Sequence, residues 1–178
     1  MRRLASVAGL ALALLFSPHA SHAGVLVHID KSRQLMTVLL DGEVLNSFVV
    51  STGRAGYGTP NGVYRPQRLA RRWFSKKYYH SPMPHSIFFH GGFAIHGSYE
   101  ISRLGGPASH GCVRLHPTDA ASLYALVQLH GPGHTKIVVT GTNPPAGAPA
   151  RPRWFDQDPP SPFYPPYPAY RPGYVYDW

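Results

Sequence analysis

The stretch GGPASHGCVRLHP (residues 105–117) contains the only cysteine of the chain, Cys112, with His110 and Gly111 before it and Arg114 after it. A single cysteine in a chain with an export signal is free and reactive, paired with another chain, or buried and inert. Gly111 lets the backbone approach a ligand closely, and the charge of Arg114 favours the thiolate. These neighbours favour a reactive thiol, and the local pattern leaves the other two possibilities open.

Histidines near the cysteine supply a candidate base. His110 is two residues before Cys112, and His96 lies upstream in AIHGS (residues 94–98). A thiolate attacks a carbonyl carbon, and a histidine can take the thiol proton and later return it to a leaving amine. The backbone amides of Gly111 and Cys112 could stabilise the oxyanion that forms. The pattern therefore predicts acyl transfer through a cysteine.

The first 23 residues have the anatomy of a secretory signal peptide. Arg2 and Arg3 form a positive n-region, residues 4–16 form an apolar run, and residues 21–23 (SHA) place small residues at the −3 and −1 positions of a cleavage site. The apolar run is shorter than the roughly 20 residues that span a bilayer, and an uncleaved anchor is the alternative. We expect a secreted protein of the periplasm or cell wall, with no transmembrane anchor after cleavage.

The chain is basic, with 17 Lys and Arg against 8 Asp and Glu, and removal of the signal peptide leaves 15 against 8. This excess suits an anionic partner, such as the carboxylates and phosphates of a cell wall or a membrane surface. Nucleic acid is also anionic, but the export signal and the lack of a nucleic-acid-binding motif argue against it.

The segment from residue 24 to 141 alternates apolar runs with glycine-rich turns. Four stretches in it have the composition of strands or strand pairs: residues 25–29, 34–50, 85–97 and 135–141. The two longer stretches are centred on Asp-Gly or Gly-Gly dipeptides, which suit hairpin turns. One helix is expected at residues 117–133, because Pro117 suits its first turn and Gly131 ends it. The pattern predicts a mostly β domain with one clear helix.

Residues 142–178 differ from the rest of the chain, since proline dominates and tyrosine and tryptophan recur. Proline fixes φ and lacks an amide donor, so this segment cannot extend a sheet or a helix. We expect a disordered, polyproline-like tail. It is either a semi-rigid spacer, as Pro-rich tails commonly are, or a binding tail whose aromatic rings offer stacking surfaces.

The motifs around the two histidines resemble the catalytic signature of the L,D-transpeptidases, the YkuD-like family of bacterial cell-wall enzymes. That signature has a histidine followed by Gly or Ser, a loop, and then Ser/Thr-His-Gly-Cys with an apolar residue and Arg or Asn. Here it maps onto residues 96–97 and 109–114. The stretch VSTGRAGYGTPNGVYRP (residues 50–66) resembles the family's Thr-Gly strand end and the Thr-Pro turn after it. The resemblance covers most of residues 24–141 and implies a YkuD-like β-sandwich.

The resemblance implies catalytic roles for three residues. Cys112 would be the acylated nucleophile, and His96 would be the base that activates it. The backbone carbonyl of Gly97 would orient the imidazole in place of a carboxylate. A carbonyl can accept the imidazole N–H and fix the tautomer without adding charge.

The resemblance also implies supporting roles around the thiol. His110 and Gly111 would line the site and help to position substrate or stabilise charge. Arg114 would hold the geometry of the site or bind a substrate carboxylate, for which its fork of donors is suited. Ser109 would form hydrogen bonds within the loop.

The segment RLARRWFSKKYYHSPMPHS (residues 68–86) is strongly basic and aromatic. The resemblance implies that it is a lid-like insertion, which varies within the family. It is either a flap over anionic peptide stems on the substrate side of the site or a solvated loop, since charge runs are usually solvated surface.

Eleven histidines raise the question of a zinc site. The chain has no HExxH or CxxC spacing, and a zinc site needs three or four ligands in tetrahedral geometry. We therefore expect neither a metal nor a cofactor.

The function that the resemblance implies is a peptidoglycan L,D-transpeptidase. Cys112 would attack the carbonyl between the third residue of a stem peptide, a meso-diaminopimelate-type diamino acid, and the following D-alanine, which leaves. An amine would then resolve the thioester, either from another stem, giving a 3–3 cross-link, or from a lysine of a wall-linked lipoprotein. With water as acceptor the same site is a carboxypeptidase or amidase, because acceptor access decides the outcome. The rivals are a non-catalytic wall-binding protein and a thiol hydrolase of another substrate.

Overall fold

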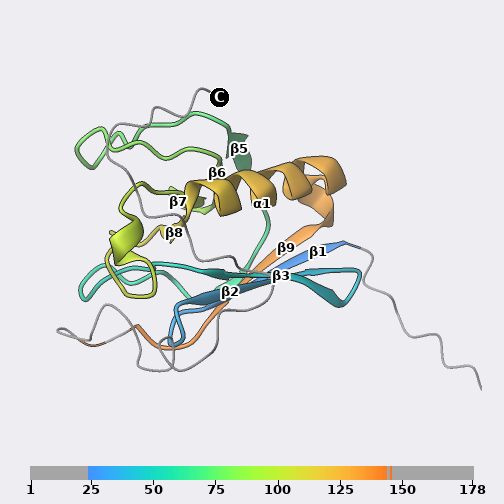
Figure 1. The fold of residues 1–178 in the computed structure, drawn as a ribbon, viewed down its shortest axis with the longest axis horizontal. Helices are drawn as coiled ribbons and strands as arrows, with labels where there is room; N and C mark the ends of the chain where they lie inside the picture. The colour runs from blue at the N-terminus through green and yellow to red at the C-terminus, as the bar shows by residue number, and fades with distance from the viewer. Residues whose placement is uncertain (1–23, 144, 146–178) are drawn as a thin grey trace, which may run out of the picture.

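Two β-sheets pack face to face, with one long helix beside the smaller sheet (Figure 1). The computed structural model describes residues 24–143 and 145. The predicted signal peptide (1–23) and nearly all of the predicted tail (142–178) therefore lie outside the described residues. The mostly β fold predicted from the sequence is confirmed.

The larger sheet has five strands in the order β3-β2-β1-β9-β4. These strands are β1 (Val25–Asp30), β2 (Leu35–Leu40), β3 (Glu43–Val49), β4 (Gly62–Tyr64) and β9 (Thr135–Thr140). The predicted hairpin is β2–β3, and its turn residues Asp41 and Gly42 have φ angles of 52° and 92°, as a tight hairpin turn requires. The first strand, β1, pairs in parallel with the last, β9, so the two ends of the described segment meet in one sheet.

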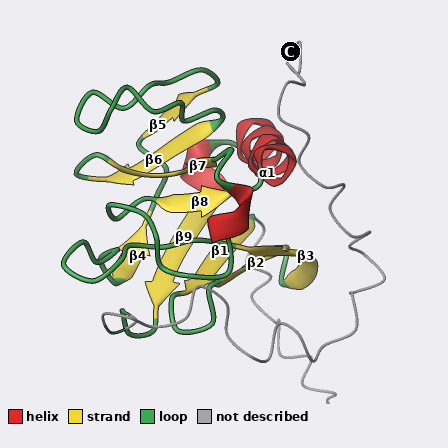
Figure 2. Cartoon of the chain, turned by 60° about the vertical axis from the view of Figure 1, so that its left-hand side comes forward, coloured by secondary structure: helices red, strands yellow, loops and turns green. Residues whose placement is uncertain are grey.

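The smaller sheet has the order β5-β6-β7-β8. Its strands are β5 (Arg68–Ala70), β6 (Ser86–His90), β7 (Phe93–Gly97) and β8 (Val113–Leu115). The predicted strand pair is β6–β7, joined at Gly91-Gly92, and β7 then pairs in parallel with β8. Figure 2 shows α1 alongside this sheet. The sequence did not predict β4, β5 or β8, which have three residues each.

Helix α1 (Pro117–His130) follows β8 after one residue. The side chain of His116 caps it by accepting from the amide of Thr118, and Gly131 ends it with a φ of 87°. This helix confirms the prediction for residues 117–133. Two short 3-10 helices complete the fold, η1 (Ile101–Arg103) and η2 (Pro132–His134). None of the helices that the structure describes has the length and apolar character needed to cross a membrane.

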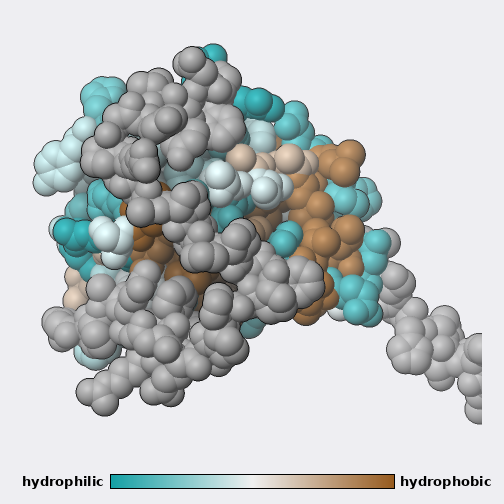
Figure 3. Space-filling view, in the orientation of Figure 1, coloured by the Kyte–Doolittle hydropathy of each residue, from teal (hydrophilic) through white to brown (hydrophobic). Residues whose placement is uncertain are grey.

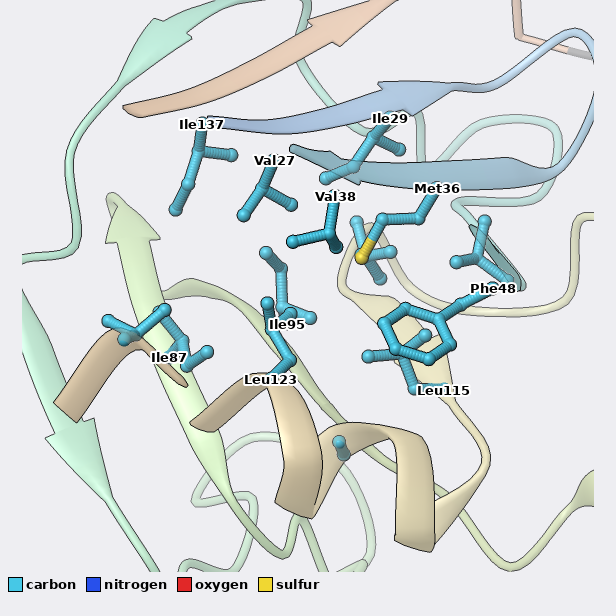
Figure 4. Close-up of a cluster of buried hydrophobic side chains, with 14 of the residues drawn as sticks. Val27, Ile29, Met36, Val38, Phe48, Ile87, Ile95, Leu115, Leu123 and Ile137 are labelled. Carbon is cyan, nitrogen blue, oxygen red and sulfur yellow. The ribbon is translucent and has the colours of Figure 1, made fainter. Parts of the chain in front are cut away.

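The core lies where the larger sheet faces β6, β7, β8 and α1 (Figure 4). Alternate side chains of β1, β2 and β9 point into it, as expected for strands with one buried face. Its almost fully buried members include Val27, Ile29, Met36, Val38, Ile87, Ile95, Leu115, Leu123 and Ile137. Each such side chain stabilises the fold by roughly 1.5–3 kcal/mol.

Leu123→Ala tests the packing of α1. Leu123 is 1 % exposed, so its truncation is expected to lower the free energy of unfolding by about 2–5 kcal/mol. Leu129 is on the same helix but 80 % exposed. Leu129→Ala is therefore expected to change the free energy of unfolding by about 0.5 kcal/mol or less. Urea unfolding followed by circular dichroism measures both. Equal losses in the two variants would contradict this packing.

Candidate active site

The ladder between β7 and β8 determines which side chains share a face of the smaller sheet. His96 pairs with Arg114 in this ladder, and the neighbouring Val113 is fully buried in the core. Side chains alternate along a strand, so His96 and Arg114 lie on the face turned away from the core. Cys112 is two residues before Arg114 and packs on the same face, against a small cluster that includes Ala94. The two residues predicted to be nucleophile and base are thus brought to one face.

His96 is buried and neutral. Its side chain is 5 % exposed, and its Nδ1 is 2.7 Å from the carbonyl oxygen of Gly97. A carbonyl oxygen only accepts, so Nδ1 carries the proton and Nε2 keeps its lone pair. Burial lowers the pKa of His96 to about 4; the hydrogen bond to Gly97 raises it, and the charge of Arg114 lowers it. At neutral pH the ring is therefore an uncharged base.

Cys112 is partly buried, and its packing opposes ionisation. It contacts a small apolar cluster that contains Met83, Phe88 and Ala94. Burial raises the pKa of the Cys112 thiol, while a backbone hydrogen bond with Ala94 and the charge of Arg114 act in the opposite direction. As expected from the sequence, the charge of Arg114 lowers the pKa of the thiol, but the effect of burial is larger. The resting group is a thiol rather than a thiolate.

Residues 50–59 hold the loop that carries Cys112. Their hydrogen bonds reach five of the residues from 105 to 111. The hydrogen bonds are Gly105 N to Val50 O, Ser51 Oγ to Gly106 O, Ala108 N and Ser109 N to Thr52 O, Arg54 N to Ser109 O, and Thr59 Oγ1 to Gly111 O.

Ser109 fixes the turn before the thiol from within the loop. Its Oγ accepts from the amide of Gly111 at 2.9 Å and donates to the carbonyl of Cys112 at 2.6 Å. The predicted role of Ser109 within the loop matches these contacts. The sequence analysis proposed the amide of Gly111 as a donor to an oxyanion, but in the structure this amide donates to Oγ of Ser109. Of the two amides considered, that of Cys112 is the better candidate.

The buried side chains of Lys31 and Gln34 form hydrogen bonds that hold residues 50–59 in place. Lys31 is 3 % exposed, and its Nζ donates to the carbonyl of Thr59 at 2.9 Å and to Oδ1 of Asn143 at 3.0 Å. Gln34 is 2 % exposed and exchanges hydrogen bonds with both the amide and the hydroxyl of Thr52. Burial lowers the pKa of Lys31. Sequence reasoning missed this network, because a Lys and a Gln in a turn carry no signal of burial.

His110 lies in a cage of polar and aromatic groups. Nη2 of Arg54 is 2.7 Å from its Nε2, and a guanidinium only donates, so the lone pair of that nitrogen is occupied. The ring of Tyr78 stacks on His110 at 4.1 Å, and Tyr57 meets it edge-on at 4.8 Å. Burial lowers the pKa of His110, and nearby cations, Arg54 first, lower it further. This geometry favours His96 over His110 as the base.

Arg114 is already paired. Its Nη1 is 3.0 Å from Oε2 of Glu100, and Arg103 approaches the same carboxylate at 3.8 Å. The backbone of Arg114 also exchanges two hydrogen bonds with Ser51. Of the two roles considered for Arg114, holding the geometry of the site is the one that these contacts favour.

The loop between β5 and β6 (residues 71–85) lies over the outer face of the smaller sheet. Trp73 and Met83 belong to the apolar cluster against which Cys112 packs, and Tyr78 stacks on His110 in the loop that carries Cys112. Figure 3 shows hydrophilic residues gathered at the upper left, over the loops next to β5 and β6. The exposed basic side chains of the segment are Arg71, Arg72, Lys76 and Lys77.

The site is separate from other candidate features of the described segment. A pocket of about 920 Å³ has lining residues that include Tyr64, His90 and Lys136. None of the predicted site residues is among its described lining residues. Within residues 24–143 and 145, no three His, Cys, Asp or Glu side chains gather into a group that could hold a metal ion.

Comparison with known families agrees with this arrangement. The family model described as the L,D-transpeptidase catalytic domain, YkuD, matches residues 24–142. The chain belongs to this family. The match contains both strands of the β7–β8 ladder and the segment at residues 50–59 that holds the loop with Cys112.

Solved members of the family are similar in fold. An L,D-transpeptidase from Stackebrandtia nassauensis is 31% identical, with a TM-score of 0.60, over 68% of this chain and 57% of that one. One from Mycobacterium smegmatis is 26% identical, with a TM-score of 0.60, over 66% and 59%. L,D-transpeptidase 3 from Mycobacterium tuberculosis, in complex with a faropenem-derived adduct, is 20% identical, with a TM-score of 0.56, over 66% and 60%. The chain thus spans less than two thirds of these relatives. Comparison with curated proteins gives no match.

The buried His96 predicts acid sensitivity. Because its pKa in the fold is about 4 against 6.5 when exposed, the unfolded state binds the proton more strongly between these values. Stability is therefore expected to fall as pH drops from 6.5 to 4, by about 3 kcal/mol from this group. Urea unfolding at several pH values should show a shallower dependence in His96→Gln than in the unmodified protein. Parallel pH dependences would contradict the lowered pKa.

Gly111 is required by space as well as by conformation. Its φ is 110°, and a Cβ there would collide with the ring of Phe93. Gly92 has a φ of 91° with no atom within 4 Å of such a Cβ, so Gly92→Ala is a control for backbone strain alone. We expect Gly111→Ala to lower the free energy of unfolding by roughly 1–3 kcal/mol more than Gly92→Ala does, as measured by thermal unfolding. Similar costs would mean that the loop accommodates the methyl group.

Proposed function

We propose that this protein is an exported peptidoglycan L,D-transpeptidase that uses Cys112 as its nucleophile. The observation that carries the proposal is the pair on the outer face of the smaller sheet. His96 is neutral, its Nδ1 hydrogen is bound by the carbonyl oxygen of Gly97, and its side chain is on the face of the sheet that Cys112 shares. A histidine with a fixed tautomer beside a cysteine is the arrangement that activates a thiol.

In the first half of the reaction, the thiol is deprotonated as it attacks. Both pKa values are shifted against charge, so the resting pair is neutral and the proton moves to Nε2 of His96 only as the C–S bond forms. The carbonyl between the third stem residue and D-alanine becomes tetrahedral, and the amide of Cys112 supports its oxyanion. The C–N bond then breaks, His96 returns the proton to the nitrogen, and D-alanine leaves. A thioester remains on Cys112.

In the second half, an acceptor attacks the thioester. The amine gives its proton to His96, the C–S bond breaks, and the sulfur regains the proton. The acceptor is a stem amine, which yields a 3–3 cross-link, or a lysine of a wall-linked lipoprotein. Water in the same position makes the protein a carboxypeptidase or amidase. The wall location agrees with the basic composition of the chain and with the signal-peptide pattern of residues 1–23.

Intact mass spectrometry with a carbapenem-type β-lactam tests the nucleophile and the base. Cys112→Ala is expected to form no adduct, because no other cysteine exists in the chain. His96→Ala is expected to keep the fold and lose about 10²–10⁴-fold in acylation rate, the usual contribution of a general base. His110→Ala is expected to lose less than His96→Ala. An adduct on Cys112→Ala, or the opposite order of the two histidine variants, would contradict the assignment.

Incubation with muropeptides distinguishes an enzyme from its rivals. A tetrapeptide donor is expected to add its acyl mass to Cys112 and to release D-alanine. A non-catalytic wall-binding protein would bind the donor without a mass gain, and a thiol hydrolase of another substrate would leave it untouched. Products formed with and without an added amine then identify the acceptor.

A further inference from the structure

Arg54 is a charged side chain at the site for which the catalytic steps have no use. It donates to Nε2 of His110 at 2.7 Å, and its guanidinium lies 4.5 Å from the centre of the Tyr57 ring. A guanidinium has five N–H donors in a planar fork. Contact with one imidazole nitrogen leaves most of them available to a ligand.

Lys77 is a second cation near the same histidine. Its Nζ is 5.4 Å from the centre of the Tyr78 ring, which itself stacks on His110 at 4.1 Å. Arg54 belongs to residues 50–59, which hydrogen-bond to the loop that carries Cys112. Lys77 belongs to the loop at residues 71–85. The two cations therefore reach His110 from separate elements.

These cations have no acidic partner in the part of the chain that the structure describes. The carboxylate near them, Glu100, is engaged by Arg114 at 3.0 Å and by Arg103 at 3.8 Å. Neither Arg54 nor Lys77 forms an ion pair with a described residue. Unbalanced positive charge at a partly buried site favours binding of an anion.

We infer that Arg54 and Lys77 form a subsite for a free carboxylate of the donor stem peptide, with the rings of Tyr57 and Tyr78 as its walls. The inference rests on the proposed function and specifies its substrate. Arg114 has a partner in Glu100, so the carboxylate binds beside His110 instead.

The position of the subsite suits a stem peptide. His110 is two residues before Cys112, so their Cα atoms are at most about 7 Å apart. An extended donor covers such a distance with about two residues. A carboxylate bound by Arg54 would therefore belong to the residue at the scissile bond or to its neighbour. The planar guanidinium pairs with a carboxylate through two parallel hydrogen bonds, which would fix the donor in front of the thiol.

The experiment compares two muropeptide donors that differ only in whether the side-chain carboxylate of the third residue, a diaminopimelate-type diamino acid, is free or amidated. Acylation of Cys112 is followed by intact mass spectrometry. We expect the unmodified protein to be acylated roughly tenfold faster by the free donor, the usual effect of a hydrogen bond to a charged group. In Arg54→Gln and in Lys77→Gln this ratio is expected to fall toward one. Lys136→Gln, an exposed lysine on β9, should keep the ratio.

A ratio near one in the unmodified protein, or a ratio that survives in the double variant Arg54→Gln and Lys77→Gln, would overturn the inference. Failure of the proposed function has a different signature, because then neither donor nor a carbapenem would acylate Cys112. A separate readout is the imidazole signal of His110 in NMR titrations. Binding of a free-carboxylate donor to Cys112→Ala should raise the pKa of His110, whereas the amidated donor should not. Equal effects of both donors would also count against the subsite.

Discussion

The parallel pairing of β7 with β8 is the constraint on which the site depends. Adjacent parallel strands cannot be joined by a tight turn, so the chain leaves β7 after Gly97 and returns to the sheet at Val113. His96 lies just before this crossover, and Cys112 is its last residue. Whatever holds the crossover in place therefore holds the thiol relative to the imidazole, and residues 50–59 do so through hydrogen bonds along its length.

Burial gives the pair its electrostatic character. It moves the pKa of His96 down and that of Cys112 up, and in both cases it outweighs the other contributions. The site therefore holds a neutral acid and a neutral base in place of a preformed ion pair. Burial is also the largest influence on the pKa of His110, but there the charges of Arg54, Arg114 and Lys77 lower the pKa further. In the function proposed above, the neutral pair carries out the chemistry, and the cations near His110 bind the substrate carboxylate.

Local sequence patterns predicted the two hairpins and the helix, but few of the contacts between segments that are far apart in the sequence. The Asp-Gly and Gly-Gly turns located both hairpins, and Pro117 and Gly131 bounded the helix. The three-residue strands were missed because three residues are too few to show an alternating pattern, and each strand forms only by pairing with another. The burial of Lys31 and the contact between Arg54 and His110 also arise only from folding. The roles expected of the motif residues came from the family resemblance, which depends only on residue identity and spacing in the sequence.

The protonated resting state of Cys112 has a consequence for the lifetime of the protein. Peroxides attack the thiolate, so a cysteine whose pKa is raised by burial enters the path to sulfenic and sulfinic acids slowly. Under the proposed function, a thiol with a raised pKa would stay reduced for longer in an oxidising compartment. The packing that raises the pKa of Cys112 thus also slows its oxidation. The chain has no second cysteine with which Cys112 could form an internal disulfide.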